Sequence, residues 1–115
     1  MELPLSVEYW KDVRFSRQVL QNFVNQVSGP AVLTGNTIIV KPSPFTPYTA
    51  LKLAELAIPC FPPGVIQTLA GNDDLGPWMT THRNIDKISF TGSTATGKKV
   101  AAVAAATMKR VTLEL

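Results

Sequence analysis

The stretch ISFTGSTATG, residues 88–97, decides the fold of this 115-residue chain. Its first four residues, Ile88 to Thr91, are mostly apolar or β-branched and predict a buried strand. Gly92 then marks a turn, and the Ser93 hydroxyl can cap a helix that we expect to run to about Met108. A strand that leads directly into a helix is the repeating unit of α/β proteins, so the stretch predicts a parallel sheet.

The same alternation of strand and helix continues on both sides of this stretch. Turn signals at Gly35-Asn36 and Pro63-Gly64 each precede a run of β-branched or apolar residues. Four strands that alternate with three helices predict a doubly wound parallel α/β sheet, Rossmann-like, with right-handed crossovers. The other expected strands are residues 37–41, 65–70 and 110–115, and the other helices are residues 47–58 and a short segment that begins at Asp73 or Asp74.

The first 28 residues have a different, more polar composition. Within them Phe15, Val19, Phe23 and Val27 recur at every fourth position, which is typical of an amphipathic helix. We therefore divide the chain into a helical leader, residues 1–28, and an α/β domain, residues 29–115.

The composition excludes several classes of protein. With 45% hydrophobic and 17% charged residues, the chain is too apolar to be disordered. The longest apolar stretch, Val100–Ala106, is far shorter than the roughly 20 residues of a membrane span, and the N-terminus lacks a basic signal region. We therefore expect a cytoplasmic protein that does not contact membranes.

Neither a nucleic-acid-binding surface nor a metal site is indicated by the sequence. The net charge is +3, but the eleven Lys and Arg residues form no dense basic stripe, so no nucleic-acid binding is expected. Cys60 and His82 are the only cysteine and histidine, so no metal site is expected.

The turn after the strand at 88–91 is the best candidate for a binding site, because ligands of open α/β sheets bind beyond the carboxyl ends of the strands. Free N–H groups and the dipole at the helix start attract phosphate, and Gly92 and Gly97 could let the backbone approach a ligand. Two alternatives remain open from the residues alone. The segment nearly matches a P-loop, with Lys99 in place of the Ser or Thr that holds magnesium, or it is a capped helix without a ligand.

Several motifs of residues 29–115 occur together in an order that resembles the cofactor-binding segment of the NAD(P)-dependent aldehyde dehydrogenase superfamily. The resemblance identifies residues 29–115 as a partial dinucleotide-binding domain of this type. The motifs are Gly35-Asn36-Thr37, Val40-Lys41-Pro42-Ser43, Thr46-Pro47, Phe61-Pro62-Pro63-Gly64-Val65, Phe90-Thr91-Gly92-Ser93-Thr94 and Val111-Thr112-Leu113-Glu114-Leu115.

The resemblance implies a role for five residues. Lys41 would hydrogen-bond the adenosine ribose of NAD or NADP, Gly92 and Ser93 would receive the pyrophosphate, and Thr91 would lie near the nicotinamide. Glu114 would be the catalytic general base. The reaction of such enzymes is the oxidation of an aldehyde substrate to its carboxylic acid.

The chain also departs from the family pattern. Pro44 stands where many relatives carry a glutamate that holds the ribose 2′-hydroxyl, so NAD and NADP both remain possible. Trp10 is followed by Lys11 rather than by the asparagine of the oxyanion hole, and the nucleophilic cysteine of the family follows a Leu-Glu-Leu-Gly-Gly motif that the sequence does not complete. Cys60 is expected to be a small packing residue. We therefore expect the isolated chain to be inactive, and a non-catalytic chain that associates with full-length aldehyde dehydrogenase is the alternative.

Overall fold

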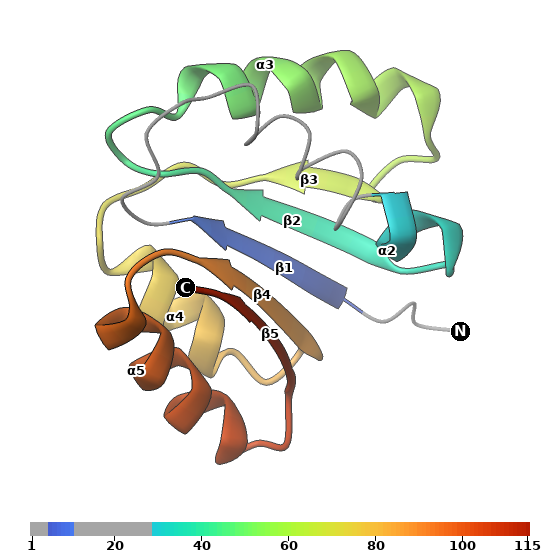
Figure 1. Cartoon of the computed structure of the whole chain (residues 1–115). Helices are drawn as coiled ribbons and strands as arrows, with labels where there is room; N and C mark the ends of the chain where they lie inside the picture. The colour runs from blue at the N-terminus through green and yellow to red at the C-terminus, as the bar shows by residue number, and fades with distance from the viewer. Residues whose placement is uncertain (1–4, 11–28) are drawn as a thin grey trace.

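The computed structural model describes residues 5–10 and 29–115, which form a five-stranded, fully parallel sheet in the order β3-β2-β1-β4-β5 (Figure 1). The expected doubly wound α/β fold is confirmed. The strands are β1 (Leu5–Trp10), β2 (Thr37–Lys41), β3 (Ile66–Thr68), β4 (Lys87–Thr91) and β5 (Arg110–Glu114). The helices are α2 (Gly29–Leu33), α3 (Tyr48–Ala57), η2 (Ile58–Cys60), α4 (Leu75–Thr81) and α5 (Thr94–Ala105).

The prediction of only four strands is wrong, because β1 is a fifth strand and occupies the centre of the sheet. Val7 lies opposite Ile39 of β2 on one side and opposite Ile88 of β4 on the other. Its sequence, LSVEYW, alternates apolar and polar residues over most of its length, which is the pattern of a strand. The short helix α2 was also missed, whereas the helix expected around Phe15 to Val27 lies outside the described residues.

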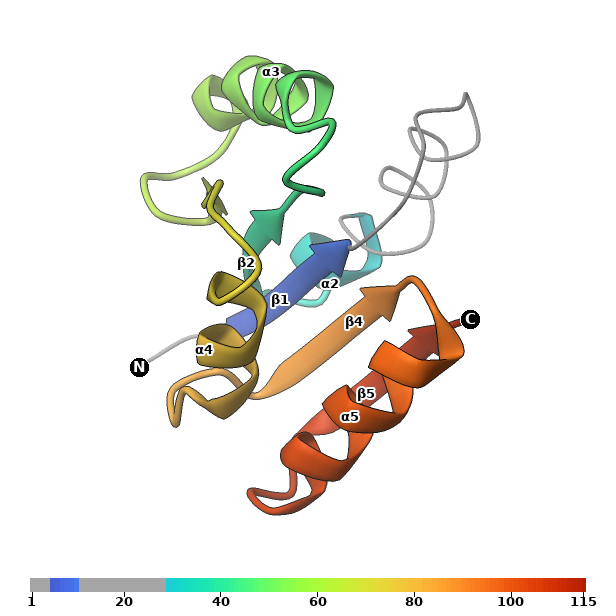
Figure 2. The same ribbon diagram turned by 90° about the vertical axis from the view of Figure 1, so that its left-hand side faces the viewer.

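The two faces of the sheet are covered by different helices. Helices α2 and α3 pack on one face, around Ile38 and Val40, whereas α4 and α5 pack on the other, around Ile88 and Phe90 (Figure 1). Figure 2 shows α5 running along β4 and β5. Because Ile38, Val40 and Phe90 are completely buried, the core lies on both sides of the central strands.

The turns explain where the elements begin and end. Val65 N–H donates to the Pro62 carbonyl, and Gly64 has φ +85°, so the predicted turn at Pro63-Gly64 forms and β3 starts at Ile66. Helix α5 ends at Ala105, earlier than expected, because Met108 adopts a left-handed conformation with φ 55° and Lys109 N–H closes back onto the Ala104 carbonyl.

We expect Phe90→Ala to lower the free energy of unfolding by about 3–5 kcal/mol, because it leaves a cavity between β4 and the helices α4 and α5. Urea denaturation followed by circular dichroism measures the change. Leu56→Ala is the control, since that α3 side chain is 65% exposed and its truncation should change the free energy by less than about 0.5 kcal/mol. Equal losses in the two variants would contradict this description of the core.

Candidate functional site

Three of the five residues expected at the site are the last residues of their strands, at the carboxyl-end edge of the sheet. Lys41 ends β2, Thr91 ends β4, and Glu114 ends β5. The parallel register places Thr91 directly opposite Glu114. Lys41 lies two strands from Thr91, or about 10 Å at the usual strand spacing. The sheet therefore brings Thr91 and Glu114 into contact and keeps Lys41 at a distance that an extended ligand could bridge.

Thr91 and Gly92 both contact Glu114. The Thr91 hydroxyl Oγ1 lies 3.5 Å from Glu114 Oε2, a long hydrogen bond, and the Gly92 N–H donates to the Glu114 carbonyl at 3.2 Å. The Glu114 carboxylate is thus held beside the turn that leads into α5. Because the Gly92 N–H already has a partner, the donors open to an anion must come from the residues that follow.

Ser93 caps α5, as the sequence predicts. Its Oγ accepts from Thr96 N–H at 3.3 Å, and its carbonyl accepts from Gly97 N–H at 2.9 Å. The Thr94 and Ala95 N–H groups precede this first helical bond and have no acceptor four residues back. No acidic residue lies in the first turn, so these amides and the helix dipole form an exposed, electropositive end.

Gly97 has a different role from the one expected. It is buried in the second turn of α5, and a Cβ added there would lie 2.4 Å from Leu115 Cδ2. Its missing side chain therefore allows α5 to pack closely on the residue after β5, rather than allowing a ligand to approach. Gly97 and Lys98 consequently lie inside the helix and not in a loop around a phosphate.

Lys41 is almost completely buried, with a relative exposure of 1%. Its Nζ donates to the Pro42 carbonyl at 3.1 Å. Ser43, also buried, accepts the Phe45 N–H through Oγ, so the turn after β2 is held by its own side chain. The Lys41 ammonium is therefore buried at the carboxyl end of β2, next to the turn that contains Pro44.

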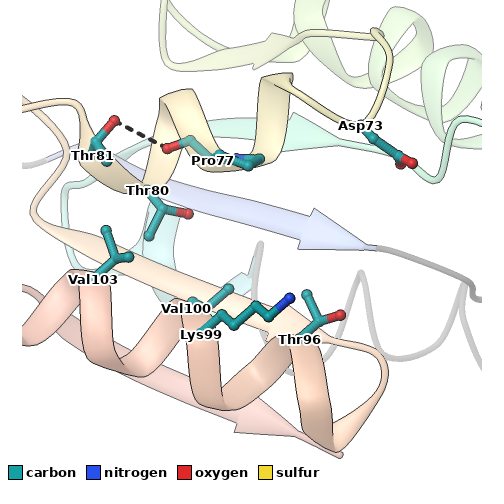
Figure 3. Close-up of a pocket in the computed structure, with 8 residues that line it drawn as sticks. All are labelled: Asp73, Pro77, Thr80, Thr81, Thr96, Lys99, Val100 and Val103. Atoms are coloured by element: carbon teal, nitrogen blue, oxygen red, sulfur yellow. Dashed lines mark hydrogen bonds between the residues drawn. The ribbon is translucent and has the colours of Figure 1, made fainter.

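A cavity of about 230 Å³ lies between α4 and α5 (Figure 3). Asp73 stands two residues before α4, and Thr96 is the third residue of α5, so the cavity begins beside the capped helix start. Three threonine hydroxyls, one lysine and one carboxylate contribute polar groups to walls that are otherwise apolar. The lining residues are Asp73, Pro77, Thr80, Thr81, Thr96, Lys99, Val100 and Val103.

The cavity was not predicted from the sequence, which indicates a helix after Ser93 but not how far that helix lies from α4. Val100 is buried as expected, whereas Val103 is 40% exposed and faces the gap between the helices. The polar residues on the facing sides of α4 and α5 were a sequence signal that could have indicated the cavity. Thr80 and Thr81 on α4 and Thr96 and Lys99 on α5 are unusual for two helices that simply pack together.

Lys109 connects the C-terminal ends of α4 and α5 through hydrogen bonds. Its Nζ donates to the carbonyl of His82, which follows α4, while its own backbone N–H bonds the Ala104 carbonyl of α5. Desolvation lowers the pKa of Lys109, and the nearby Asp86 carboxylate acts in the opposite direction. This contact holds the two walls of the cavity at the end opposite the capped helix start.

The remaining reactive side chains lie away from this edge. Cys60 is exposed in η2, so its expected role as a packing residue is wrong, and it precedes β3 at the amino-end edge of the sheet. His82 Nδ1 accepts from Asn84 N–H. Within residues 5–10 and 29–115 no group of three potential metal ligands occurs. In the same residues no helix combines the length and apolar character needed to cross a membrane.

A doubly wound parallel sheet with an anion-accepting helix start at its carboxyl edge defines the class of nucleotide-binding α/β domains. Within that class, residues 21–115 match the model of the aldehyde dehydrogenase family. The chain therefore belongs to this family, as its motifs indicate.

Similar proteins agree with the assignment. Aldehyde dehydrogenase LUC3 of a Fusarium species is 64% identical over 85 residues, which is 74% of this chain and 18% of the relative. The mitochondrial succinate-semialdehyde dehydrogenase of Arabidopsis thaliana is 51% identical over 89 residues, or 76% of this chain and 17% of that protein. The crystal structure of Mycobacterium tuberculosis aldehyde dehydrogenase complexed with NAD+ superposes with a TM-score of 0.80 at 38% identity, covering 96% of this chain and 22% of that one. The chain thus spans about a fifth of the length of these proteins.

We expect Ser93→Ala to lower the free energy of unfolding by about 1 kcal/mol, because the Thr96 N–H loses its capping acceptor. Ser93→Asn keeps an acceptor at the same position and should remain within a few tenths of a kcal/mol of the wild type. Chemical denaturation of the three proteins checks both values. An unchanged free energy in Ser93→Ala would show that the cap does not stabilise α5.

Proposed function

We propose that the chain forms the central part of the coenzyme-binding domain of an NAD(P)+-dependent aldehyde dehydrogenase, an enzyme that oxidises an aldehyde to a carboxylic acid. The observation that carries the proposal is the start of α5, where two open amides lie beside a cavity at the carboxyl edge of the sheet. Family membership and the NAD+ complex among the similar structures support the choice of ligand.

The chemistry of the site suits such a coenzyme. The Thr94 and Ala95 amides suit the diphosphate, because N–H groups at a helix start favour anions. The adjacent cavity suits the flat adenine ring, since Pro77, Val100 and Val103 offer apolar contacts and threonine hydroxyls offer hydrogen bonds. Lys41 is the candidate donor to the adenosine ribose, and its buried ammonium would have to turn from the Pro42 carbonyl to reach it.

The other end of the coenzyme would extend along the carboxyl edge toward Thr91 and Glu114. The bound coenzyme would supply the hydride acceptor. Glu114 would take the proton from the nucleophile or from the hydrolytic water, as a general base. The Thr91 hydroxyl restrains the Glu114 carboxylate through their 3.5 Å contact, so Thr91 would hold the base in position next to the nicotinamide.

Two variants of Ser93 distinguish repulsion of the coenzyme's diphosphate from destabilisation of α5. Asp and Asn are both good helix caps of nearly equal size, but only Asp adds a negative charge at the anion site. We expect Ser93→Asp to weaken binding of NAD+ and NADP+ at least about tenfold, and Ser93→Asn to bind within about twofold of the wild type. Isothermal titration calorimetry measures the affinities. Equal affinity in the Asp and Asn variants would remove the proposed diphosphate site.

We further propose that this chain by itself does not oxidise aldehydes. Its only cysteine, Cys60, lies before β3 at the amino-end edge of the sheet, away from Glu114 at the carboxyl-end edge. The thiolate that attacks an aldehyde must lie within reach of its base, and this separation prevents it.

The expected outcome is that purified chain with an aldehyde and either coenzyme produces no reduced nicotinamide above a protein-free blank. Absorbance of the reduced coenzyme is the measurement, and a complete aldehyde dehydrogenase is the positive control. Turnover that disappears in Cys60→Ser would contradict the proposal and assign the nucleophile to Cys60.

We also propose that the chain can associate with full-length aldehyde dehydrogenase. Its described surface exposes large apolar side chains on both sides of the sheet, among them Leu56 at 65% and Trp78 at 67%. Such surfaces favour docking onto another chain. Co-expression with a full-length relative should yield a stable complex in size-exclusion chromatography, whereas a monodisperse monomer under these conditions would contradict the proposal.

A further inference from the structure

Strand β5 is an edge strand of the sheet, and within residues 5–10 and 29–115 no strand pairs with its outer side (Figure 1). Its pairing with β4 runs without interruption through all five residues, Arg110–Glu114, and the strand contains neither a bulge nor a proline. Such features normally protect an edge strand from pairing with another chain. The opposite edge strand, β3, has only three residues, so β5 is the longer of the two edges.

The hydrogen bonds to β4 show which backbone groups of β5 face outward. The Arg110 N–H and the Glu114 carbonyl bond the residues that directly flank β4, at 3.0 and 3.2 Å. Because the direction of the backbone groups alternates along a strand, Val111 and Leu113 direct their N–H and C=O groups away from β4. The outer side of β5 therefore offers two donors and two acceptors to a further strand.

The charges of β5 are complementary to those of the same strand in the reverse direction. The strand begins with Arg110 and ends with Glu114. Both side chains lie on the sheet face opposite α5, because the alternating residues Val111 and Leu113 pack on the α5 side. Arg110 is exposed and Glu114 is half-buried, so both can contact another chain.

We propose that β5 pairs antiparallel with β5 of a second copy of this chain, about a two-fold axis at Thr112. In this register Arg110 lies opposite Glu114 of the second copy, and Glu114 lies opposite its Arg110. Opposite charges in directly facing positions of two antiparallel strands stabilise their pairing. The two sheets would thus join into one continuous sheet, and the inference is independent of coenzyme binding.

The same register also satisfies the backbone. Val111 stands opposite Leu113 of the second copy, and since both direct their backbone groups outward, each such pair exchanges two hydrogen bonds. A slide of one residue would set an outward-facing residue against one that faces β4. A slide of two residues would place Arg110 or Glu114 opposite Thr112 instead of an opposite charge. The backbone and the charges therefore select one register.

Helix α5 leaves room for this dimer. It connects β4 to β5 and packs over both strands (Figure 2). At a strand spacing of about 4.8 Å, a helix axis midway between β4 and β5 would lie about 10 Å from its equivalent in the second copy, a normal distance for packed helices. Lys99 and Val103 face the cavity beside α4, so the helical period places Ala101 and Ala105 on the opposite flank, toward the second copy. Their small side chains permit this approach.

The experiment is sedimentation velocity of the full chain over a series of concentrations. At high concentration the wild type should have twice the 12.5 kDa mass of the chain. Arg110→Glu turns both attractive pairs into repulsive ones, because the two-fold axis repeats each contact, and should raise the dissociation constant of the dimer at least about tenfold. Glu114→Arg should have the same effect. The double variant restores both pairs with exchanged signs and should return the constant to within about threefold of the wild type.

Two further variants complete the design. Lys52→Glu is the matched control, since it makes the same change of charge on the exposed side of α3 and should leave the dissociation constant within about twofold. Thr112→Lys places two ammonium groups opposite each other at the axis and should weaken the dimer at least about fivefold. It leaves Glu114 and its contact with Thr91 unchanged, so it tests the interface even if Glu114→Arg does not fold. Circular dichroism checks the folding of each variant.

Three results overturn the inference. A wild type that remains monomeric up to about 1 mM would show that the β5 edge does not pair. A dimer that is insensitive to Arg110→Glu and Thr112→Lys would lie on another surface, such as that of the exposed Leu56 or Trp78 side chains. A folded double variant that dissociates as readily as folded single variants would show that the charges of β5 do not pair across the axis.

Discussion

Parallel pairing of the backbone along β1 is the constraint on which the rest of the molecule depends. This central strand aligns β2 on one side and β4 on the other, and β4 in turn aligns β5. The carboxyl ends of these strands consequently meet at one edge, where Lys41, Thr91 and Glu114 are the last residues of their strands. A shift of one residue in the register of β4 and β5 would separate Thr91 from Glu114, and a shift along β1 would misalign Lys41 with the end of β4.

The site combines two features that lie next to each other because α5 follows β4 with only Gly92 and Ser93 between them. The cap at Ser93 directs the first helical amides outward, and the gap between α4 and α5 starts within one turn of that cap. Gly97 allows α5 to lie close to the end of β5, and Lys109 connects the far end of α5 to the residue that follows α4. The positions of both helices are thus determined by contacts outside the proposed ligand site.

Much of this arrangement could be predicted from local signals in the sequence. The β-branched run at Thr37–Lys41, the Ser93 cap and the Pro63-Gly64 turn each depend on a few neighbouring residues, and the structure contains all three. Strand β1 was missed because a single short alternating segment, LSVEYW, is weak evidence within a polar region, although its neighbours in the sheet stabilise it strongly. The cavity could not be predicted, because it depends on how two helices are spaced. The role of Gly97 likewise depends on its contact with Leu115, which is distant in sequence.

The most direct test of the central claim is a crystal structure of the chain with a bound coenzyme. We expect oxygens of the diphosphate to accept hydrogen bonds from the Thr94 and Ala95 amides, and the adenine ring to occupy the space between α4 and α5. A coenzyme bound elsewhere on the chain, with the start of α5 in contact only with water, would contradict it.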